Sequence, residues 1–308
     1  MTYRIHWFKK NLRFQDNEIL LKTDNSSSIL LYIIEPELWL QKDMSQRQWE
    51  FIWESLNSLK IDLAKRNLHL NILSGDALEI FQTLHQKYSF TEVISEQETG
   101  IYWTFKRDKK LKTLFNNLNA NWVEYPYFGV KRGNHNRDHW ARSIQQILKK
   151  PLINNEKYID QSEILDFDEH EIPINFYDKT PCPFRQKGGS HKAHDLLETF
   201  LESRGENYQK EMSSPVTAEY SCSRLSPHFA HGTLSLRQAF QLAEKKRFEI
   251  QPTNKVFAKS INAFLSRLHW RSHFIQKLED EPSIEMKSFI PLYDDIRDQD
   301  EEKLQSWI

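Results

Sequence analysis

Five short runs of β-branched and aromatic residues divide the first part of the chain, and segments with helical spacing lie between them. The runs cover residues 3–8, 29–34, 68–73, 92–95 and 122–125. Residues 45–66 carry apolar side chains at steps of three and four, and residues 76–88 and 102–118 repeat that period. Strands that alternate with crossover helices are typical of a parallel sheet. We therefore predict a doubly wound α/β domain with a five-stranded parallel sheet over residues 1–130.

A doubly wound sheet binds ligands at the carboxyl ends of its strands, so we expect a site near Lys9, Glu35 and Gly75. The chain has eight glycines and neither a GxGxxG nor a GxxxxGK motif, which argues against an NAD- or ATP-dependent enzyme. Past the fourth strand, a predicted helix carries Trp103, Lys106, Arg107 and Asp108. These four residues either line a cleft for a flat ligand or form a solvated helix face around a core tryptophan.

The middle of the chain is predicted to connect two domains. Residues 149–185 lose the helical period and contain four prolines, which indicates an extended connection. The preceding residues 131–148 are locally basic through Lys131, Arg132, His135, Arg137 and Arg142. This cluster either steers DNA or forms an ordinary solvated loop and helix. We assign residues 131–185 to an interdomain linker with a basic helix.

Three segments with helical spacing, 194–204, 234–245 and 255–278, predict that the second domain, residues 186–308, is all-α. In the last segment, one apolar stripe consists of Ile261, Leu265, Leu268 and Ile275. An adjacent stripe consists of Phe264, Arg267, Arg271 and Phe274. The second stripe either offers aromatic rings and arginines to a flat, anionic ligand, or its arginines simply extend into water.

The turn before the second of these helices, YSCSRLSPHFAHGTLSLR at residues 220–237, has the residues of an anion site. Ser223 and Ser226 flank Arg224, and Pro227 is suited to the first turn of a helix. Hydroxyl groups, a guanidinium and free backbone N–H groups would then converge on one point, as they do in phosphate sites. The alternative is an ordinary serine N-cap beside a surface arginine.

Composition limits the class of protein. The chain has 308 residues, of which 39% are hydrophobic, enough for two folded domains. Its net charge of -1 means that nucleic-acid binding would require a local basic patch. The longest apolar run, 29–34, is too short for a membrane span and no signal peptide is evident, so we expect a cytoplasmic protein. Cys182 and Cys222 suggest neither a disulfide framework nor a metal site.

Four blocks of sequence together resemble the photolyase and cryptochrome family. They are HWFKKNLRFQDN at 6–17, RD at 107–108, CSRLSPHFAHGTLSLRQ at 222–238 and RLHWRSHFIQKLE at 267–279. Because they keep the order and spacing of the family, they are far more specific than any one block. The resemblance implies an N-terminal α/β antenna domain followed by a helical domain that holds a U-shaped FAD.

The resemblance also implies which residues form the sites. The segment that holds the FAD phosphates is matched by Tyr208, Cys222, Ser223, Arg224, Leu225 and Ser226. Further cofactor-facing positions are matched by Phe264, Arg267 and Arg271. Trp270 matches an aromatic residue that packs against a flipped-out pyrimidine dimer, and we expect it to bind DNA with Arg271 and Phe274. No catalytic residue is assigned, because the cofactor would perform the chemistry.

Several positions depart from the family pattern. Cys222 stands where many relatives have threonine, and a thiol is a weak hydrogen-bond donor. Arg267 stands where repair enzymes have a glutamate that hydrogen-bonds the damaged base; an arginine cannot accept a hydrogen bond, which counts against repair of the usual cyclobutane dimer. Trp103 and Thr104 replace the Asn and Glu of members that bind a folate antenna. A second antenna chromophore would therefore be of unknown identity.

Family members continue well past the position that matches Ile308 and carry a TGxPxxDA helix there, so we expect a truncated chain with an incomplete FAD-binding domain. Weak FAD retention and exposed apolar surface on the second domain should follow. The resemblance implies a light-driven lyase that repairs pyrimidine dimers in damaged DNA, here as a monomer. The alternatives are a cryptochrome-like light sensor without repair activity and a non-functional remnant, so enzymatic activity stays open.

Overall fold

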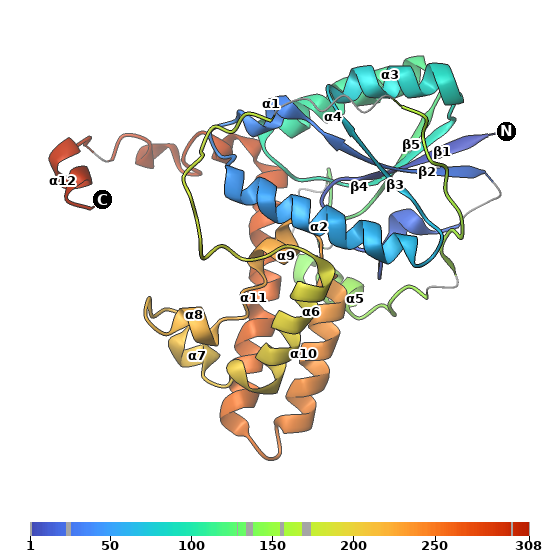
Figure 1. Cartoon of the computed structure of the whole chain (residues 1–308). Coiled ribbons are helices and arrows are strands. Elements are labelled where there is room, and N and C mark those ends of the chain that lie inside the picture. Colours follow the sequence, from blue (N-terminus) through green and yellow to red (C-terminus); the bar gives the residue numbers. More distant parts are fainter. Residues whose placement is uncertain are drawn as a thin grey trace.

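Five parallel strands form a single sheet in the N-terminal half of a computed structural model of the chain (Figure 1). The strands are β1 (Tyr3–Phe8), β2 (Ser27–Ile34), β3 (Leu70–Ser74), β4 (Glu92–Glu96) and β5 (Asn121–Tyr125). Their order is β3-β2-β1-β4-β5, and every neighbouring pair is parallel. The chain therefore starts in the middle of the sheet and winds outward in both directions, which confirms the predicted doubly wound domain.

The structure describes residues 2–22, 26–127, 129–133, 138–154, 157–167, 174–296 and 298–307. His135 and Arg137 of the predicted basic cluster lie outside these ranges. Within the described ranges, no helix combines the length and the apolar composition that crossing a bilayer requires.

Helices cover both faces of the sheet (Figure 1). They are α1 (Pro36–Trp39), α2 (Gln46–Ala64), α3 (Ala77–Tyr88) and α4 (Tyr102–Asn117), and the 3₁₀ turn η1 (Glu18–Leu20) precedes β2. Alternate residues of each strand point to opposite faces. In β1, Phe8 packs with the α2 side chains, whereas Ile5 and Trp7 pack with those of α3 and α4. Two apolar cores result, one on each side of the sheet.

The long connection after β5 is partly helical and partly extended. Its helix α5 (Trp140–Leu148) buries Ile144 and Leu148 in the core of the helical region rather than against the sheet. Tyr158 and Phe176, farther along, pack on the α/β domain. This segment is therefore held by both parts of the molecule instead of being a free tether.

The helical region lies below the sheet in Figure 1 and is built around a long hairpin. Its elements are α6 (Ser190–Thr199), the π-helical turn η3 (Phe200–Arg204), α7 (Tyr208–Glu211), α8 (Ala218–Ser221), α9 (Ser226–Ala230), α10 (Leu236–Ile250), α11 (Lys255–Asp280), η4 (Pro282–Glu285), η5 (Pro291–Tyr293) and α12 (Glu301–Gln305). The hairpin consists of α10 and α11, and their apolar faces share one core with α6.

A buried polar seam joins the two parts of the molecule. The Asp16 carboxylate accepts hydrogen bonds from Ser235 and from Arg237, whose Nε lies 3.0 Å away. Gly232 has a φ of 64°, and a Cβ there would lie 2.1 Å from the carbonyl oxygen of Lys10. Only glycine fits such a close approach. The seam fixes the helical region against the ends of the strands.

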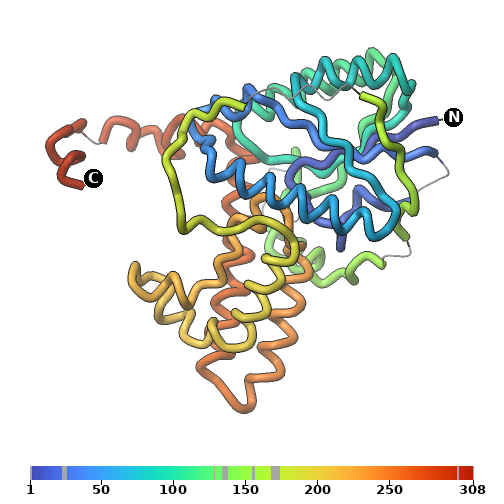
Figure 2. Tube along the Cα trace, viewed as in Figure 1, coloured from blue at the N-terminus to red at the C-terminus, as the bar shows by residue number. Residues whose placement is uncertain are grey.

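The last segment of the chain extends away from this body (Figure 2). It exposes apolar side chains, including Leu292 and Trp307, which are 89% and 92% exposed. Trp270 and Phe274 on α11 are also about half exposed. The helical region thus shows the exposed apolar surface that we predicted for it.

Candidate functional site

The loop of residues 222–226, which we call the phosphate loop, has the backbone geometry of an anion site. Arg224 is left-handed, with a φ of 62°, and Leu225 follows at φ -89° and ψ -2°. Such a left–right pair turns successive N–H groups toward one concave side, a nest that binds anions. Within the described part of the chain, the N–H groups of residues 223–226 donate to no acceptor. Leu225 is fully buried, so the unpaired N–H groups that a ligand can reach are those of Ser223, Arg224 and Ser226.

Arg204 lies behind the phosphate loop and was not among the predicted residues. Its guanidinium donates to the carbonyl oxygens of Cys222, of Ser223 at 3.4 Å and of Tyr220 at 3.3 Å. It also donates to the carbonyl oxygen of Leu196 at 2.9 Å, near the end of α6. One side chain thus connects α6 to three carbonyl groups, two in the loop and one just before it. The only signal in the sequence was a basic residue at the end of the predicted helix 194–204.

Tyr208, Cys222 and Arg267 lie near one another. Burial raises the pKa of Tyr208, the nearby Cys222 raises it further, and the positive charge of Arg267 lowers it. Burial likewise raises the pKa of Cys222, whereas Arg224 and Arg204 lower it. The Arg267 side chain is exposed and reaches the sulfur of Met212 at 4.0 Å. Two guanidinium groups and a phenol therefore border the open N–H groups.

Leu225 and Phe264 lie in the hydrophobic core instead of on an open surface. They are 0% and 2% exposed, and the Phe264 ring is 4.9 Å from that of Phe200. Tyr208 packs on the same ring at 5.5 Å. These side chains form the floor beneath the phosphate loop, so their contribution to a ligand is to hold its other contacts in place.

Arg271 links α11 to α9 and to the segment after β5. Its guanidinium donates to the Tyr127 hydroxyl and, at 2.7 Å, to the carbonyl oxygen of Phe229. The loop before Pro227 and the arginine stripe of α11 therefore lie on the same side of the molecule. A flavin site formed jointly by the loop and α11 requires that they lie close together in this way.

Trp270 and Phe274 form an exposed pair of rings on α11. They are 48% and 58% exposed, and their ring centroids are 5.7 Å apart with a tilt of 35°. His273 packs edge-on against both rings. Exposed aromatic rings next to arginines are a surface on which unstacked bases can stack. The third predicted DNA contact, Arg271, points instead toward Phe229 and Tyr127.

A second candidate site is a cavity of about 260 Å³ at the carboxyl ends of the strands. Its charged lining residues are Lys9, Lys10, Glu35, Glu98 and Arg107, and its aromatic ones include Trp7, Tyr32 and Trp39. The position agrees with the site expected near Lys9 and Glu35. Gly75 and Trp103 are not among the residues that line it.

The charges of this strand-end cavity are paired with one another. Arg107 contacts Glu35 at 2.5 Å and Glu98 at 2.8 Å, and Lys9 contacts Asp108 at 3.2 Å. Burial raises the pKa of Glu35 to about 7, against the opposing effect of Arg107. For Glu98, burial acts in the same direction, but Lys10, Arg107 and Lys9 together outweigh it and lower its pKa.

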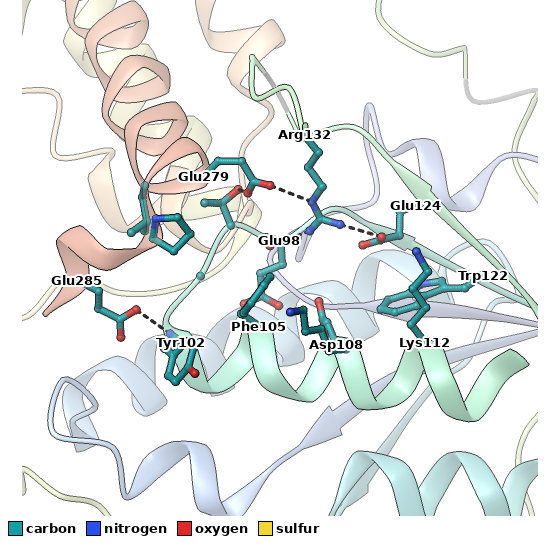
Figure 3. A pocket seen from close by; sticks show the side chains of 15 residues that line it. Glu98, Tyr102, Phe105, Asp108, Lys112, Trp122, Glu124, Arg132, Glu279 and Glu285 are labelled. Atoms are coloured by element: carbon teal, nitrogen blue, oxygen red, sulfur yellow. Dashed lines mark hydrogen bonds and ion pairs between the residues drawn. The ribbon is translucent and has the colours of Figure 1, made fainter. Parts of the chain in front are cut away.

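A third cavity, of about 280 Å³, lies between the α/β domain and the end of α11 (Figure 3). Arg132 spans it, with Glu124 at 2.8 Å and Glu279 at 3.4 Å. The Glu285 carboxylate accepts a hydrogen bond of 2.7 Å from the N–H of Tyr102, the first residue of α4. Glu285 of the helical region thus caps the N-terminus of α4 in the α/β domain. Its negative charge interacts favourably with the positive end of the helix dipole.

Comparison with known proteins places these sites in context. A family model for DNA photolyase matches residues 4–126. Deoxyribodipyrimidine photo-lyase of Escherichia coli is 24% identical over 100% of this chain and 67% of its own length. Cryptochrome-2 of Gallus gallus is 22% identical over 98% of this chain and 56% of its own. Residues 4–126 thus match the DNA photolyase model, and nearly the whole chain is similar in sequence to photolyases and cryptochromes.

Solved structures of a cryptochrome and a photolyase share the fold of this chain along nearly its whole length. A cryptochrome from Synechocystis superposes with a TM-score of 0.81 at 17% identity and covers 99% of this chain and 67% of its own. An archaeal photolyase from Sulfolobus tokodaii, solved with two FAD molecules, gives a TM-score of 0.73 at 20% identity over 100% of this chain and 66% of its own. The chain spans between about half and two thirds of the length of these relatives.

Proposed function

We propose that this chain binds FAD and takes part in blue-light-dependent repair of pyrimidine dimers by photoinduced electron transfer. The observation that carries this proposal is the phosphate loop, in which the N–H groups of residues 223–226 are unpaired and those of Ser223, Arg224 and Ser226 belong to residues that are not fully buried. A diphosphate needs several donors on one side and a positive charge nearby, and the loop offers both. Similarity to DNA photolyases, one of which was solved with two FAD molecules, supports FAD as the ligand that brings the diphosphate.

Each residue has a separate task in this proposal. The N–H groups of residues 223–226 and the Arg224 side chain would hold the diphosphate. Tyr208 and Arg267 would limit the position of the rest of the cofactor, and Phe264 and Leu225 would support it from the core. When bound, reduced FAD would supply the excited electron that splits the dimer. The exposed rings of Trp270 and Phe274 would stack with the displaced bases and orient them.

A second candidate function is light sensing without repair, as in a cryptochrome. Arg267 favours it, because its guanidinium lies near Tyr208 and has no lone pair with which to accept a hydrogen bond from a damaged base. In this case the loop and α11 would still hold FAD, but no group at position 267 would accept a hydrogen bond from DNA. Cytoplasmic location and a monomeric state stay predictions from the sequence.

We further propose that the strand-end cavity takes a second, planar antenna chromophore of still unknown identity. Its aromatic lining suits a flat ring, and its ion pairs would meet polar groups on the ring edge. The cavity in Figure 3 is the other candidate, since Phe105 and Trp122 also border it.

Illumination of the protein with dimer-containing DNA distinguishes the two functions. The full chain is loaded with FAD under reducing conditions, mixed with a single-stranded oligonucleotide that carries one cyclobutane dimer, and exposed to blue light. Repair predicts light-dependent recovery of intact pyrimidines by chromatography, whereas light sensing predicts flavin photochemistry without recovery. A chain that binds neither FAD nor ADP would refute both.

A further inference from the structure

We infer that Arg204 is a positioning residue for the phosphate loop, which rests on the proposed FAD function and names a residue that supports it. The structural basis is a single guanidinium that donates to the carbonyl oxygens of Tyr220, Cys222 and Ser223. Arg204 itself is half-buried, and its guanidinium carbon Cζ lies 5.8 Å from the centroid of the Phe200 ring. Its head group is therefore confined to one place.

Peptide geometry converts these carbonyl contacts into oriented donors. In a trans peptide, the C=O of one residue and the N–H of the next point in opposite directions. The chain has no cis peptide among its described residues. Because Arg204 holds the carbonyl oxygens of Cys222 and Ser223 on its own side, the N–H groups of Ser223 and Arg224 must face away from it. These are two of the unpaired donors of the phosphate loop.

The helix that carries Arg204 is shaped for this contact. The α6 helix ends in the π-helical turn Phe200–Arg204, which widens the last turn. At Gly205, which follows, a Cβ would lie 2.7 Å from the carbonyl oxygen of Phe200. The guanidinium turns back to the carbonyl oxygen of Leu196 and so also satisfies the end of α6. The loop is thereby tied to a rigid element.

The charge of Arg204 adds to the orientation. All four of its acceptors are neutral carbonyl groups, so its positive charge is not cancelled by a carboxylate at these contacts. Burial lowers the pKa of Arg204, Cys222 opposes that shift, and the neighbouring Arg224 lowers it further. A dianionic ligand at the loop would be attracted by both guanidinium groups and would reduce their mutual repulsion.

Substitutions at position 204 can distinguish the planar guanidinium of arginine from a positive charge alone. A lysine would keep the positive charge but could not reach four carbonyl groups in one plane. We therefore expect R204K to lose most of the contribution that Arg204 makes to phosphate affinity, and R204M to lose all of it. Charge-assisted hydrogen bonds of about 1.5–3 kcal/mol correspond to a loss of about 10- to 150-fold in affinity.

The experiment measures binding of ADP, FAD and riboflavin to the full chain by equilibrium dialysis. For wild type we expect ADP and FAD to bind and riboflavin, which has no phosphate, to bind much more weakly. R204K and R204M should lower the ADP and FAD affinities and leave the riboflavin affinity unchanged. The matched control is K210M, an exposed cation on α7 that makes no contact with the loop.

The outcomes separate this inference from the proposed function. If wild type shows no preference for ADP over riboflavin, the phosphate loop itself is wrong. If wild type prefers ADP but R204K and R204M bind it as wild type does, only the role of Arg204 is overturned. Equal losses for ADP and riboflavin would also overturn it, because they would indicate a general loss of structure, which circular dichroism of both variants would detect.

Discussion

The strand-end cavity and the phosphate loop differ in how their polar groups are satisfied. In the cavity, the Arg107 guanidinium bonds the Glu35 carboxylate at 2.5 Å and the Glu98 carboxylate at 2.8 Å. In the loop, the N–H groups of residues 223–226 have no acceptor within the described part of the chain. Paired charges stabilise the fold itself, whereas open donors are held in place by their surroundings for a ligand. Substitutions should therefore lower stability in the first region and ligand affinity in the second.

The largest effect should come from R107M. This change removes the ion-pair partner of the buried Glu35 and one of the partners of Glu98, and breaking a buried ion pair from one side costs about 3–5 kcal/mol. Urea unfolding should show this loss. R132M is the matched control, because Arg132 is a third exposed and its ion pairs should contribute less than about 1 kcal/mol. Equal losses for both variants would contradict the contrast between buried and partly exposed pairs.

Acidification should weaken the contact between the two parts of the molecule through His228. This residue is fully buried, lies 5.0 Å from the Phe51 ring of α2, and has its pKa lowered to about 4 by burial and then by His194. The unfolded chain binds the proton near pH 6.5, the folded chain only near pH 4. Stability is therefore complete above about pH 6.5 and falls by about 3 kcal/mol as the pH drops to about 4.

The measurement is the free energy of unfolding across that pH range for wild type and H228Q. Glutamine does not titrate, so the variant should lose part of the slope between about pH 6.5 and 4 and keep the slope outside it. An unchanged slope would show that His228 is not the group responsible.

Replacement of the exposed ring at position 270 should affect DNA and leave stability nearly unchanged. Base stacking on an aromatic ring contributes about 1–3 kcal/mol, so W270A should weaken binding of single-stranded DNA about 5- to 150-fold. Its free energy of unfolding should change by less than about 1 kcal/mol, because the ring is half exposed. W53A is the control: Trp53 is 43% exposed on α2 and also packs on a neighbouring ring. A similar DNA loss in W53A would argue against a specific surface.

The smallest effects should come from the two loop hydroxyls. Ser223 and Ser226 each offer one neutral hydrogen bond, with a net value of about 1 kcal/mol, so S223A and S226A should each weaken FAD binding about 5-fold. Thermal unfolding without ligand should not change. S266A, at an exposed position of α11, serves as the control. Loss of stability without loss of FAD affinity would place these residues in the fold and not in the site.

Local sequence patterns predicted the positions of strands and helices well, because these patterns follow the periodic burial of side chains. The strand at residues 3–8, the capped helix Ala77–Tyr88 and the long helix Lys255–Asp280 all lie within a few residues of their predicted positions. Arg204 could not be predicted in the same way, since its partners at Cys222 and Ser223 depend on a π-helical turn and on tertiary packing. For the same reason, helical spacing predicted that Phe264 faces a ligand, whereas in the structure Phe264 packs against Phe200 in the core.

The central claim is that the open N–H groups of residues 223–226 bind phosphate, and amide hydrogen exchange tests it most directly. Without a ligand, these groups have no acceptor among the described residues, and those of Ser223, Arg224 and Ser226, which are not fully buried, should exchange rapidly. Saturating ADP should slow exchange in a peptide that spans residues 222–228, whereas riboflavin should not. Protection by ADP at the strand-end cavity alone, with this peptide unchanged, would contradict the account.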